Sequence, residues 1–410
     1  MKPTGPIPAW FAEEEGMLLI AGHGAASVVD EAGDTPLFAY DMGIVEAQVR
    51  RFRNAMPDRL HLHYAIKANP FAPLLARMGG QVDGFDIASG GELTMALDAG
   101  MAPDRISFAG PGKRDDELEG AIFAGVTINL ESEGEGRRAL AAANRIGKTP
   151  RLAVRVNPDF DLKGSGMRMG GGAKPFGVDA ERAAALARAM IDAGADWRGW
   201  HIFAGSQNLA PEAIIETQAA TIALAARLSD DVGATPPLVN LGGGFGLAYF
   251  PGDTPLDIRS IGVALDSALA DLPDILETSD FALELGRWLV GEAGVYLTRV
   301  IDVKASQGET FVVVDGGLHH QLAASGNFGT VVRRNYPIAV ANRFGAPPAD
   351  DPVTVVGCLC TPIDRLGDKV ALPPVQEGDI IAIFLAGAYG ATASPAAFLG
   401  HPSPREVLLG

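Results

Sequence analysis

The chain has 410 residues, of which 47% are hydrophobic and 20% charged, and it carries a formal net charge of −17 at pH 7. This length predicts two domains, and the composition is that of a globular protein with ample material for a core. A strongly acidic chain without a basic cluster is not expected to bind nucleic acid or an anionic membrane. No apolar run reaches membrane-spanning length, and the first residues lack the layout of a signal peptide.

The two cysteines, Cys358 and Cys360, are separated by a single residue. Neighbours this close rarely form a disulfide with good geometry, and two thiols alone are too few for a metal ion. The sequence therefore predicts no metal site and a reducing, cytoplasmic compartment.

Short β-rich runs alternate with helical segments between Leu60 and Arg287. The runs are "LHLHYAIKA", "VDGFDIAS", "ISFAG", "VTINLES", "LAVRVNP", "GWHIFAGS", "LVNLGGG" and "FALELGR". Eight strand–helix units predict an α/β fold, a closed (β/α)8 barrel of the TIM type over residues 38–285. An open, doubly wound parallel sheet is the alternative.

The segment after Arg287 contains strand-like runs such as "ETFVVVDGG", "VTVVGCLC" and "DIIAIFLAGAYG", with few helical patterns between them. It predicts a C-terminal all-β domain, like a sandwich or barrel. We assign residues 286–410 to this domain, together with residues 1–37, which precede the barrel.

Unusual residues fall where barrel enzymes place their chemistry, at the carboxyl ends of the strands. They are Lys67, Asp86, Arg155, His201, Ser206, the glycines 242–244, Glu284 and Arg287. One polar residue at a strand end is weak evidence for a functional site. Polar residues at the same position in most of the eight units favour such a site more strongly.

Three of these features together indicate one cofactor. A lysine in a barrel mouth, Lys67, is desolvated and can attack a carbonyl. The glycines of "LGGGFG" let backbone N–H groups approach a phosphate, although a glycine turn is more often only a tight loop. Glu284 can hold a ring nitrogen or simply pair with Arg287, and Ser206 can bind phosphate or cap a helix. An aldehyde, a phosphate and a pyridine nitrogen are the groups of pyridoxal 5'-phosphate.

The chain resembles the fold-type III pyridoxal-phosphate decarboxylases, the group of diaminopimelate, ornithine and arginine decarboxylases. The resemblance rests on ordered motifs along nearly the whole chain: "YAIKANP", "GFDIASGGEL", "RVNP", "GSQ", "LGGGFG", "ELGR", "GCLCTPIDRLG" and "GAYGATASPAAF". It implies a barrel with a C-terminal β domain, an amino-acid substrate, and a head-to-tail homodimer that shares its active sites.

The resemblance also implies roles for individual residues. Lys67 is similar to the Schiff-base lysine, and Glu284 to the carboxylate that pairs with the pyridine nitrogen. Cys360 and Asp364 match residues that reach in from the partner subunit, where the cysteine protonates the reacting carbon. The other residues implied to bind the cofactor are Asp86, Arg155, His201, Ser206, Gly243, Gly244, Gly286, Arg287 and Tyr389; Tyr389 is also implied to lie near the substrate.

Two departures from the family pattern bear on the ring and the substrate. Phe203 in "HIFAGS" stands where the family has a histidine that stacks on the cofactor ring, and a phenyl ring can still stack. Thr361 follows Cys360 where diaminopimelate decarboxylases have a glutamate that binds the distal ammonium. A hydroxyl is a weak partner for a cation, so Thr361 argues against diaminopimelate.

The stretches "CTPID", "GSQNL" and "ASGNFG" look more like an exosortase-associated subgroup, one type of which decarboxylates a glutamyl group on an acyl-carrier protein. Arg333, Arg334 and Tyr336 would then meet phosphopantetheine or a substrate carboxylate, or they are ordinary surface residues of a loop. The alternatives for the whole chain are a diaminopimelate decarboxylase proper and an amino-acid racemase of the same architecture.

Overall fold

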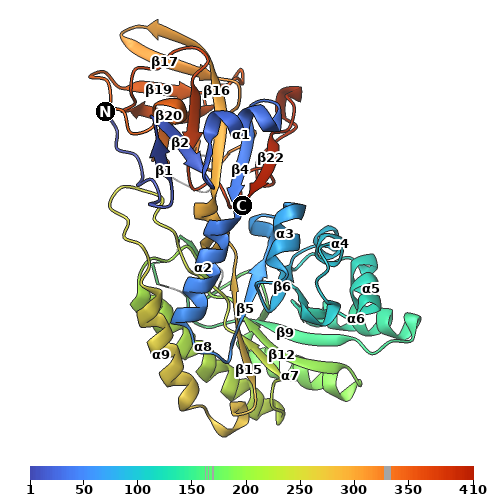
Figure 1. Cartoon of the computed structure of the whole chain (residues 1–410). Coiled ribbons are helices and arrows are strands. Elements are labelled where there is room, and N and C mark those ends of the chain that lie inside the picture. The colour runs from blue at the N-terminus through green and yellow to red at the C-terminus, as the bar shows by residue number, and fades with distance from the viewer. Residues whose placement is uncertain (162, 165, 169, 327–333) are drawn as a thin grey trace. The chain divides into compact units, whose positions relative to one another are not determined.

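The computed structural model describes residues 1–161, 163–164, 166–168, 170–326 and 334–410. The chain forms two compact units (Figure 1). The barrel unit consists of Val49–Leu247 and Pro255–Gly286, and the β unit of Met1–Gln48, Ala248–Thr254 and Arg287–Gly410.

The barrel unit is a closed ring of eight parallel strands within the described residues. Neighbouring strands pair in the order β9-β12-β14-β15-β5-β6-β7-β8, and a further pairing of β8 with β9 closes the ring. This confirms the predicted (β/α)8 barrel and excludes the open doubly wound sheet. The strands are β5 (Leu60–Ala65), β6 (Gly84–Ile87), β7 (Ile106–Phe108), β8 (Thr127–Leu130), β9 (Arg151–Asn157), β12 (Asp196–Ile202), β14 (Leu238–Asn240) and β15 (Asp280–Leu285).

Helices alternate with these strands because their apolar faces can cover the ring. Side-chain caps mark where two of them begin: Ser89 accepts a hydrogen bond from Glu92 N, and Ser132 from Glu135 N, both at 3.1 Å. In the described part of the chain, no helix is long and apolar enough to cross a membrane. The helices are α2 (Met42–Ala55), α3 (Ala72–Met78), α4 (Gly90–Asp98), α5 (Asp115–Ala124), α6 (Glu133–Ile146), α7 (Ala180–Asp192), α8 (Pro211–Val232) and α9 (Ile258–Ala270).

The β unit is built on a curled sheet in the order β18-β21-β16-β17-β19-β20. A fully buried core that includes Leu18, Val295 and Phe384 joins this sheet to the N-terminal segment. Its main strands are β16 (Gly294–Ser306), β17 (Glu309–Val314), β18 (Ile338–Val340), β19 (Val353–Val356), β20 (Arg365–Val370) and β21 (Ile380–Ile383).

The N-terminal part of the β unit comprises three short strands and one helix. They are β1 (Ala12–Glu14), β2 (Met17–Ile20), β3 (His23–Gly24) and α1 (Ala25–Ala32). Other short elements in the described part of the chain are β10 (Met167–Arg168), β11 (Val178–Asp179), β13 (Gly205–Ser206) and α10 (Arg287–Val290).

Strand β4 (Leu37–Asp41) changes where the first boundary falls. It pairs with β16 and with the C-terminal strand β22 (Arg405–Leu409), and the three lie side by side in Figure 1 in blue, orange and red. Residues 38–48 therefore group with the β unit, whereas the sequence assigned them to the barrel. The apolar run "LFAYD" is compatible with a strand of either sheet, because its local pattern does not specify which strand it pairs with.

Candidate active site

Lys67 lies directly after the first barrel strand. A short 3₁₀ turn, Ile66–Ala68, follows β5, and the Tyr64 hydroxyl supports it by donating to the Asn69 carbonyl oxygen at 2.9 Å. The Lys67 side chain is exposed, with Nζ 5.9 Å from the centre of the Phe203 ring. The structure thus does not bear out the expected desolvation of this lysine.

One cavity of about 360 Å³ brings six of the predicted residues together. Its volume and mixed lining are typical of a small-molecule site. The six residues are Lys67, Asp86, Arg155, His201, Phe203 and Glu284. The cavity thus offers an amine, carboxylates, a guanidinium and an aromatic face to one bound molecule.

Glu284 is held in place by two polar side chains. Its Oε2 lies 2.9 Å from His201 Nε2 and accepts a hydrogen bond from Asn240 Nδ2 at 3.3 Å. Burial raises the pKa of Glu284, but the charge and hydrogen bond of His201 outweigh it and lower the pKa to about 2. Glu284 is therefore an anion at neutral pH, as a partner for a protonated ring nitrogen must be.

Asp86 and His63 form a second buried pair at the same end of the barrel. His63 Nδ1 lies 3.4 Å from Asp86 Oδ2, and each residue is less than a tenth exposed. Burial lowers the pKa of His63, but the adjacent Asp86 carboxylate raises it above its usual value overall. The Asp86 carboxylate is therefore paired with an imidazole and also lines the cavity.

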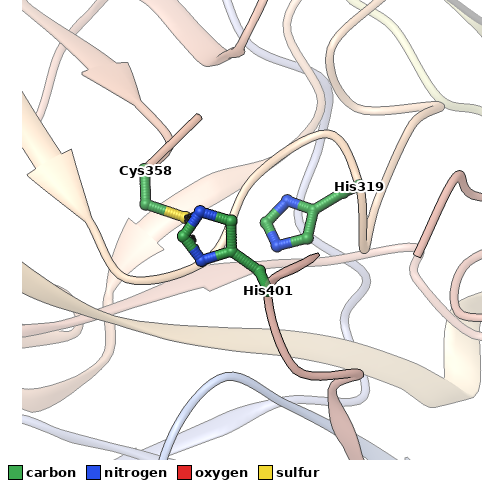
Figure 2. A group of neighbouring side chains, drawn as sticks. All are labelled: His319, Cys358 and His401. Carbon is green, nitrogen blue, oxygen red and sulfur yellow. Dashed lines mark hydrogen bonds between the residues drawn. The ribbon is translucent and has the colours of Figure 1, made fainter. Parts of the chain in front are cut away.

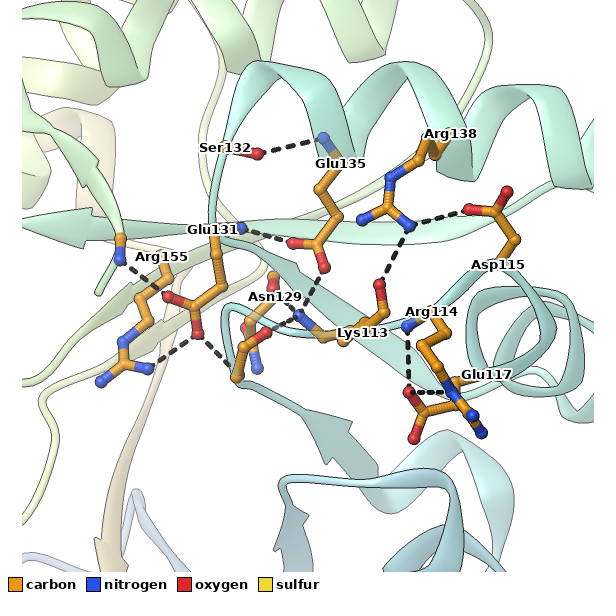
Figure 3. A network of polar contacts seen from close by, with 12 residues as sticks. Lys113, Arg114, Asp115, Glu117, Asn129, Glu131, Ser132, Glu135, Arg138 and Arg155 are labelled. Atoms are coloured by element: carbon orange, nitrogen blue, oxygen red, sulfur yellow. Dashed lines mark hydrogen bonds and ion pairs between the residues drawn. The ribbon is translucent and has the colours of Figure 1, made fainter. Parts of the chain in front are cut away.

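Arg155 is fixed by a network of buried charges that extends through α5 and α6 (Figure 3). Its Nη1 donates to Glu131 Oε1 at 2.8 Å, and the backbone N–H groups of Gly110 and Gly177 donate to the same carboxylate. Burial raises the pKa of Glu131, but Arg155 more than reverses this and keeps the carboxylate ionised. The orientation of the Arg155 guanidinium is therefore fixed within the protein itself, before a ligand binds.

Lys113 is the other cation of the network. Its Nζ donates to the carbonyl oxygens of Gly110 (2.8 Å) and Asn129 (2.9 Å) and to Glu135 Oε1 (3.1 Å). Burial lowers the pKa of Lys113 and raises that of Glu135, and their mutual attraction opposes both shifts. All three donor positions of the ammonium are used, so Lys113 is a structural cation.

The glycine segment after β14 is packed too tightly for a side chain. A Cβ on Gly243 would lie 2.2 Å from the carbonyl oxygen of Glu284, and Gly244 has a φ of 98°. Asn208 N donates to the Gly244 carbonyl oxygen at 2.9 Å, which ties this turn to the segment that carries Ser206. Ser206 and the glycines thus share one loop layer, as a phosphate cradle requires.

In the β unit, Arg287 lies among aromatic rings. Its guanidinium carbon is 4.8 Å from the centre of the Tyr389 ring and 5.5 Å from that of Tyr249. Tyr336 is buried beside Tyr249 and Phe250. Arg287 and Tyr389, both predicted to bind the cofactor, are therefore in direct contact.

The predicted loop residue Arg334 stacks over Phe250 at 3.8 Å. Its neighbour Arg333 lies outside the described residues. Arg334 thus packs on the aromatic cluster of the β unit.

The predicted residues of the "CTPID" loop differ in exposure. Cys360 is exposed, Thr361 is half-buried and Asp364 is only 2% exposed. Asp364 accepts hydrogen bonds from Leu318 N at 2.7 Å and Leu359 N at 2.9 Å. Asp364 thus fixes the conformation of the loop that carries Cys360.

The sequence reasoning missed several residues that position the cavity lining, namely His63, Lys113, Glu131, Glu135 and Asn240. Glu131 and Asn240 lie at or just past the carboxyl end of a strand, in "VTINLES" and "LVNLGGG", so the rule that found Glu284 was available for them. Lys113 and Glu135 lie in a loop and a helix and give no such signal.

The barrel, its cavity and the donor set define an α/β-barrel enzyme that can hold a carbonyl cofactor on a lysine. The chain belongs to the pyridoxal-dependent decarboxylases: residues 42–291 match the family described as "Pyridoxal-dependent decarboxylase, pyridoxal binding domain". It is thus a carboxy-lyase whose cofactor is pyridoxal phosphate, and the donors fit that group, since lysine, carboxylate, aromatic ring and glycine turn each have a counterpart on it.

Two curated relatives cover most of the chain. The L-glutamyl-[BtrI acyl-carrier protein] decarboxylase of Niallia circulans is 38% identical over 92% of this chain and 89% of its own length. The diaminopimelate decarboxylase of Methanothermobacter thermautotrophicus is 33% identical over 98% of this chain and 93% of its own.

Among solved structures, the diaminopimelate decarboxylase of M. jannaschii in complex with L-lysine has a TM-score of 0.87 at 26% identity, covering 97% of this chain and 92% of its own. The diaminopimelate decarboxylase of Helicobacter pylori with L-lysine has a TM-score of 0.83 at 27% identity, covering 94% of each chain. Both carry the same two-part architecture along nearly their whole length.

Proposed function

We propose that this decarboxylase acts on an aminoacyl group, of glutamyl type, carried as a thioester on an acyl-carrier protein. The observation that carries the proposal is Thr361, which stands directly after Cys360 where a glutamate would bind the distal ammonium of diaminopimelate. The 38% identity to a carrier-protein glutamyl decarboxylase supports it.

The roles proposed for the barrel residues follow from their contacts. Bound pyridoxal phosphate supplies the electron sink for loss of CO2. Lys67 holds the cofactor's aldehyde carbon, and Glu284, kept ionised by His201, holds the ring nitrogen protonated. Phe203 covers a ring face, and Asp86 and Arg155 orient the polar edge of the ring.

The roles proposed for the phosphate and substrate ends follow from the motifs that carry the family resemblance. Ser206, Gly243, Gly244 and Gly286 receive the phosphate together with Arg287 and Tyr389. Cys360 protonates the reacting carbon, Asp364 positions the Cys360 loop, and Arg333, Tyr336 and Thr361 meet the substrate arm. A homodimer in the cytoplasm, with Cys360 supplied across its interface, completes the proposal.

Free diaminopimelate is the second candidate substrate. The 33% identity to a diaminopimelate decarboxylase over 98% of this chain favours it. Thr361 speaks against it, because an ammonium without a charge partner binds weakly.

The test is CO2 release from three substrates offered separately: a glutamyl carrier-protein thioester, free glutamate and diaminopimelate. We expect turnover of the thioester alone. The matched variant Thr361→Glu restores the acid and should lower thioester turnover while admitting diaminopimelate. Wild-type protein that consumes diaminopimelate and ignores the thioester contradicts the substrate proposal.

The lysine assignment has its own test. Lys67→Ala should lack the visible absorbance of lysine-bound pyridoxal phosphate and lose CO2 release, whereas Cys360→Ala should keep the absorbance and lose turnover. A Lys67→Ala protein with the wild-type spectrum refutes the assignment.

A further inference from the structure

Three side chains from distant parts of the β unit converge near the "CTPID" loop (Figure 2). His319, Cys358 and His401 each offer one potential ligand atom, and these atoms all lie within 4.8 Å of one another. Cys358 Sγ lies 3.8 Å from His401 Nδ1 and 3.9 Å from Nε2. A thiolate and two imidazoles are ligands that zinc and other transition metals accept in proteins.

The separation of the Cys358 and His401 ligand atoms is compatible with a tetrahedral ion. With Zn–S of about 2.3 Å and Zn–N of about 2.0 Å, a sulfur and a nitrogen at two corners of a tetrahedron lie about 3.5 Å apart. The observed Cys358–His401 separation of 3.8 Å is close to this value.

The environment of the His319 side chain indicates that it binds a ligand. The residue has no exposed surface, yet neither Nδ1 nor Nε2 has a hydrogen-bond partner in the described structure. A buried imidazole left in this way destabilises the folded protein, because its polar atoms lose water and gain no partner. A hydrogen bond between Cys358 and His401 would satisfy those two residues but not His319, whereas a shared ion would satisfy all three.

The surroundings hold the three ligands in place. Asp364 accepts from Leu318 N and Leu359 N, the neighbours of His319 and Cys358, and so fixes both loops with a single carboxylate. His320 is not available as a ligand, because its Nδ1 lies 3.0 Å from the Tyr296 hydroxyl and its Nε2 lies 2.9 Å from the carbonyl oxygen of Pro402. That last contact anchors the segment next to His401.

We propose that His319, Cys358 and His401 bind a transition-metal ion of the zinc class, with a fourth position open to water or another ligand. The thiolate and two imidazoles select zinc-like ions over magnesium or calcium, which prefer oxygen ligands. The ion would tie together the two loops and the C-terminal segment of the β unit. Because the donors come from separate segments, binding should also stabilise the folded state.

The test uses the full-length holoenzyme, stripped with a chelator under reducing conditions, loaded with zinc chloride and freed of excess metal by gel filtration. Elemental analysis should find one zinc per chain in the wild type and almost none in Cys358→Ser or His401→Gln. Matched controls are Cys360→Ser, which removes the neighbouring thiol, and His23→Gln, which removes an exposed histidine; both should keep the zinc. Wild-type protein that retains no more zinc than Cys358→Ser overturns the proposal.

Two further readouts separate loss of the site from loss of the fold. Zinc should raise the melting temperature of the wild type and leave that of His401→Gln unchanged, although both show the same circular dichroism. Cobalt(II) in place of zinc should give a thiolate charge-transfer band that is present in Cys360→Ser and absent in Cys358→Ser. A cobalt band that vanishes in Cys360→Ser instead contradicts the assigned ligand set.

Discussion

The two buried polar clusters of the molecule differ in how their members are paired. In the barrel unit, Lys113, Glu131, Glu135 and Arg155 exchange hydrogen bonds at 2.8–3.1 Å, and both cations bind a carboxylate (Figure 3). In the β unit, the side chain of His319 (Figure 2) makes no hydrogen bond in the described structure. The first cluster is complete without a ligand, and the second is not.

This contrast distinguishes polar groups that are already paired within the protein from polar groups that lack a partner. A closed network stabilises the fold only while all its partners are present, so any single deletion exposes an uncompensated charge. An open cluster costs stability until a ligand arrives, so deleting a member can be harmless in the ligand-free protein. Four variants test the contrast, in order of decreasing effect.

Lys113→Met should give the largest loss of stability, about 3–5 kcal/mol, because it leaves Glu135 buried without its cation. Urea denaturation followed by circular dichroism measures the loss. The double variant Lys113→Met with Glu135→Met removes both charges and should recover part of it. Equal losses in the single and double variants would mean that the pair is not coupled.

The contribution of Glu284 to the stability of the folded protein should depend on pH. Its pKa is lowered from 4.5 to about 2, so its ionised form adds stability above pH 4.5, and this contribution is lost as the pH falls from 4.5 towards 2. The contribution is on the order of 3 kcal/mol. At pH 6 the wild type should unfold at a higher urea concentration than Glu284→Gln. The difference between the two urea midpoints should be smaller at pH 3. A gap that does not change with pH would contradict the assigned partner, His201.

Asp364→Asn keeps the shape of the side chain but removes the charge that two backbone N–H groups share. We expect a loss of about 1–3 kcal/mol and weaker zinc retention, because the two loops lose their common acceptor. Thermal melting and elemental analysis measure the two effects. If zinc retention is unaffected, Asp364 does not position the ligands.

His319→Phe should have the smallest effect, with a sign that depends on metal. In zinc-free protein it should be neutral or stabilise by about 1 kcal/mol, because an unpaired imidazole is replaced by a ring of similar size. In zinc-loaded protein it should be less stable than the wild type. Melting temperatures with and without zinc measure whether His319→Phe stabilises or destabilises the protein. A clearly lower melting temperature in both states would mean that His319 belongs to a closed network instead.

Much of the fold and the site was predictable from local signals. Each of the eight strand-like runs forms a strand of the barrel, because apolar runs that alternate regularly with helical segments favour a parallel sheet covered by helices. Lys67, Asp86, Arg155, His201, Phe203 and Glu284 were found by motif and position, and they line one cavity.

The sequence by itself determined the barrel, the family and the polar residues at the strand ends, since these depend on neighbours in the chain. The tertiary structure alone decided three things: that Leu37–Asp41 joins the β sheet, that Glu131 holds Arg155, and that His319 and His401 lie beside Cys358. Each of these depends on partners far apart in the chain, which no local pattern specifies. Hence the expectation of no metal site, made from two cysteines alone, could not anticipate the histidines that the fold places next to one of them.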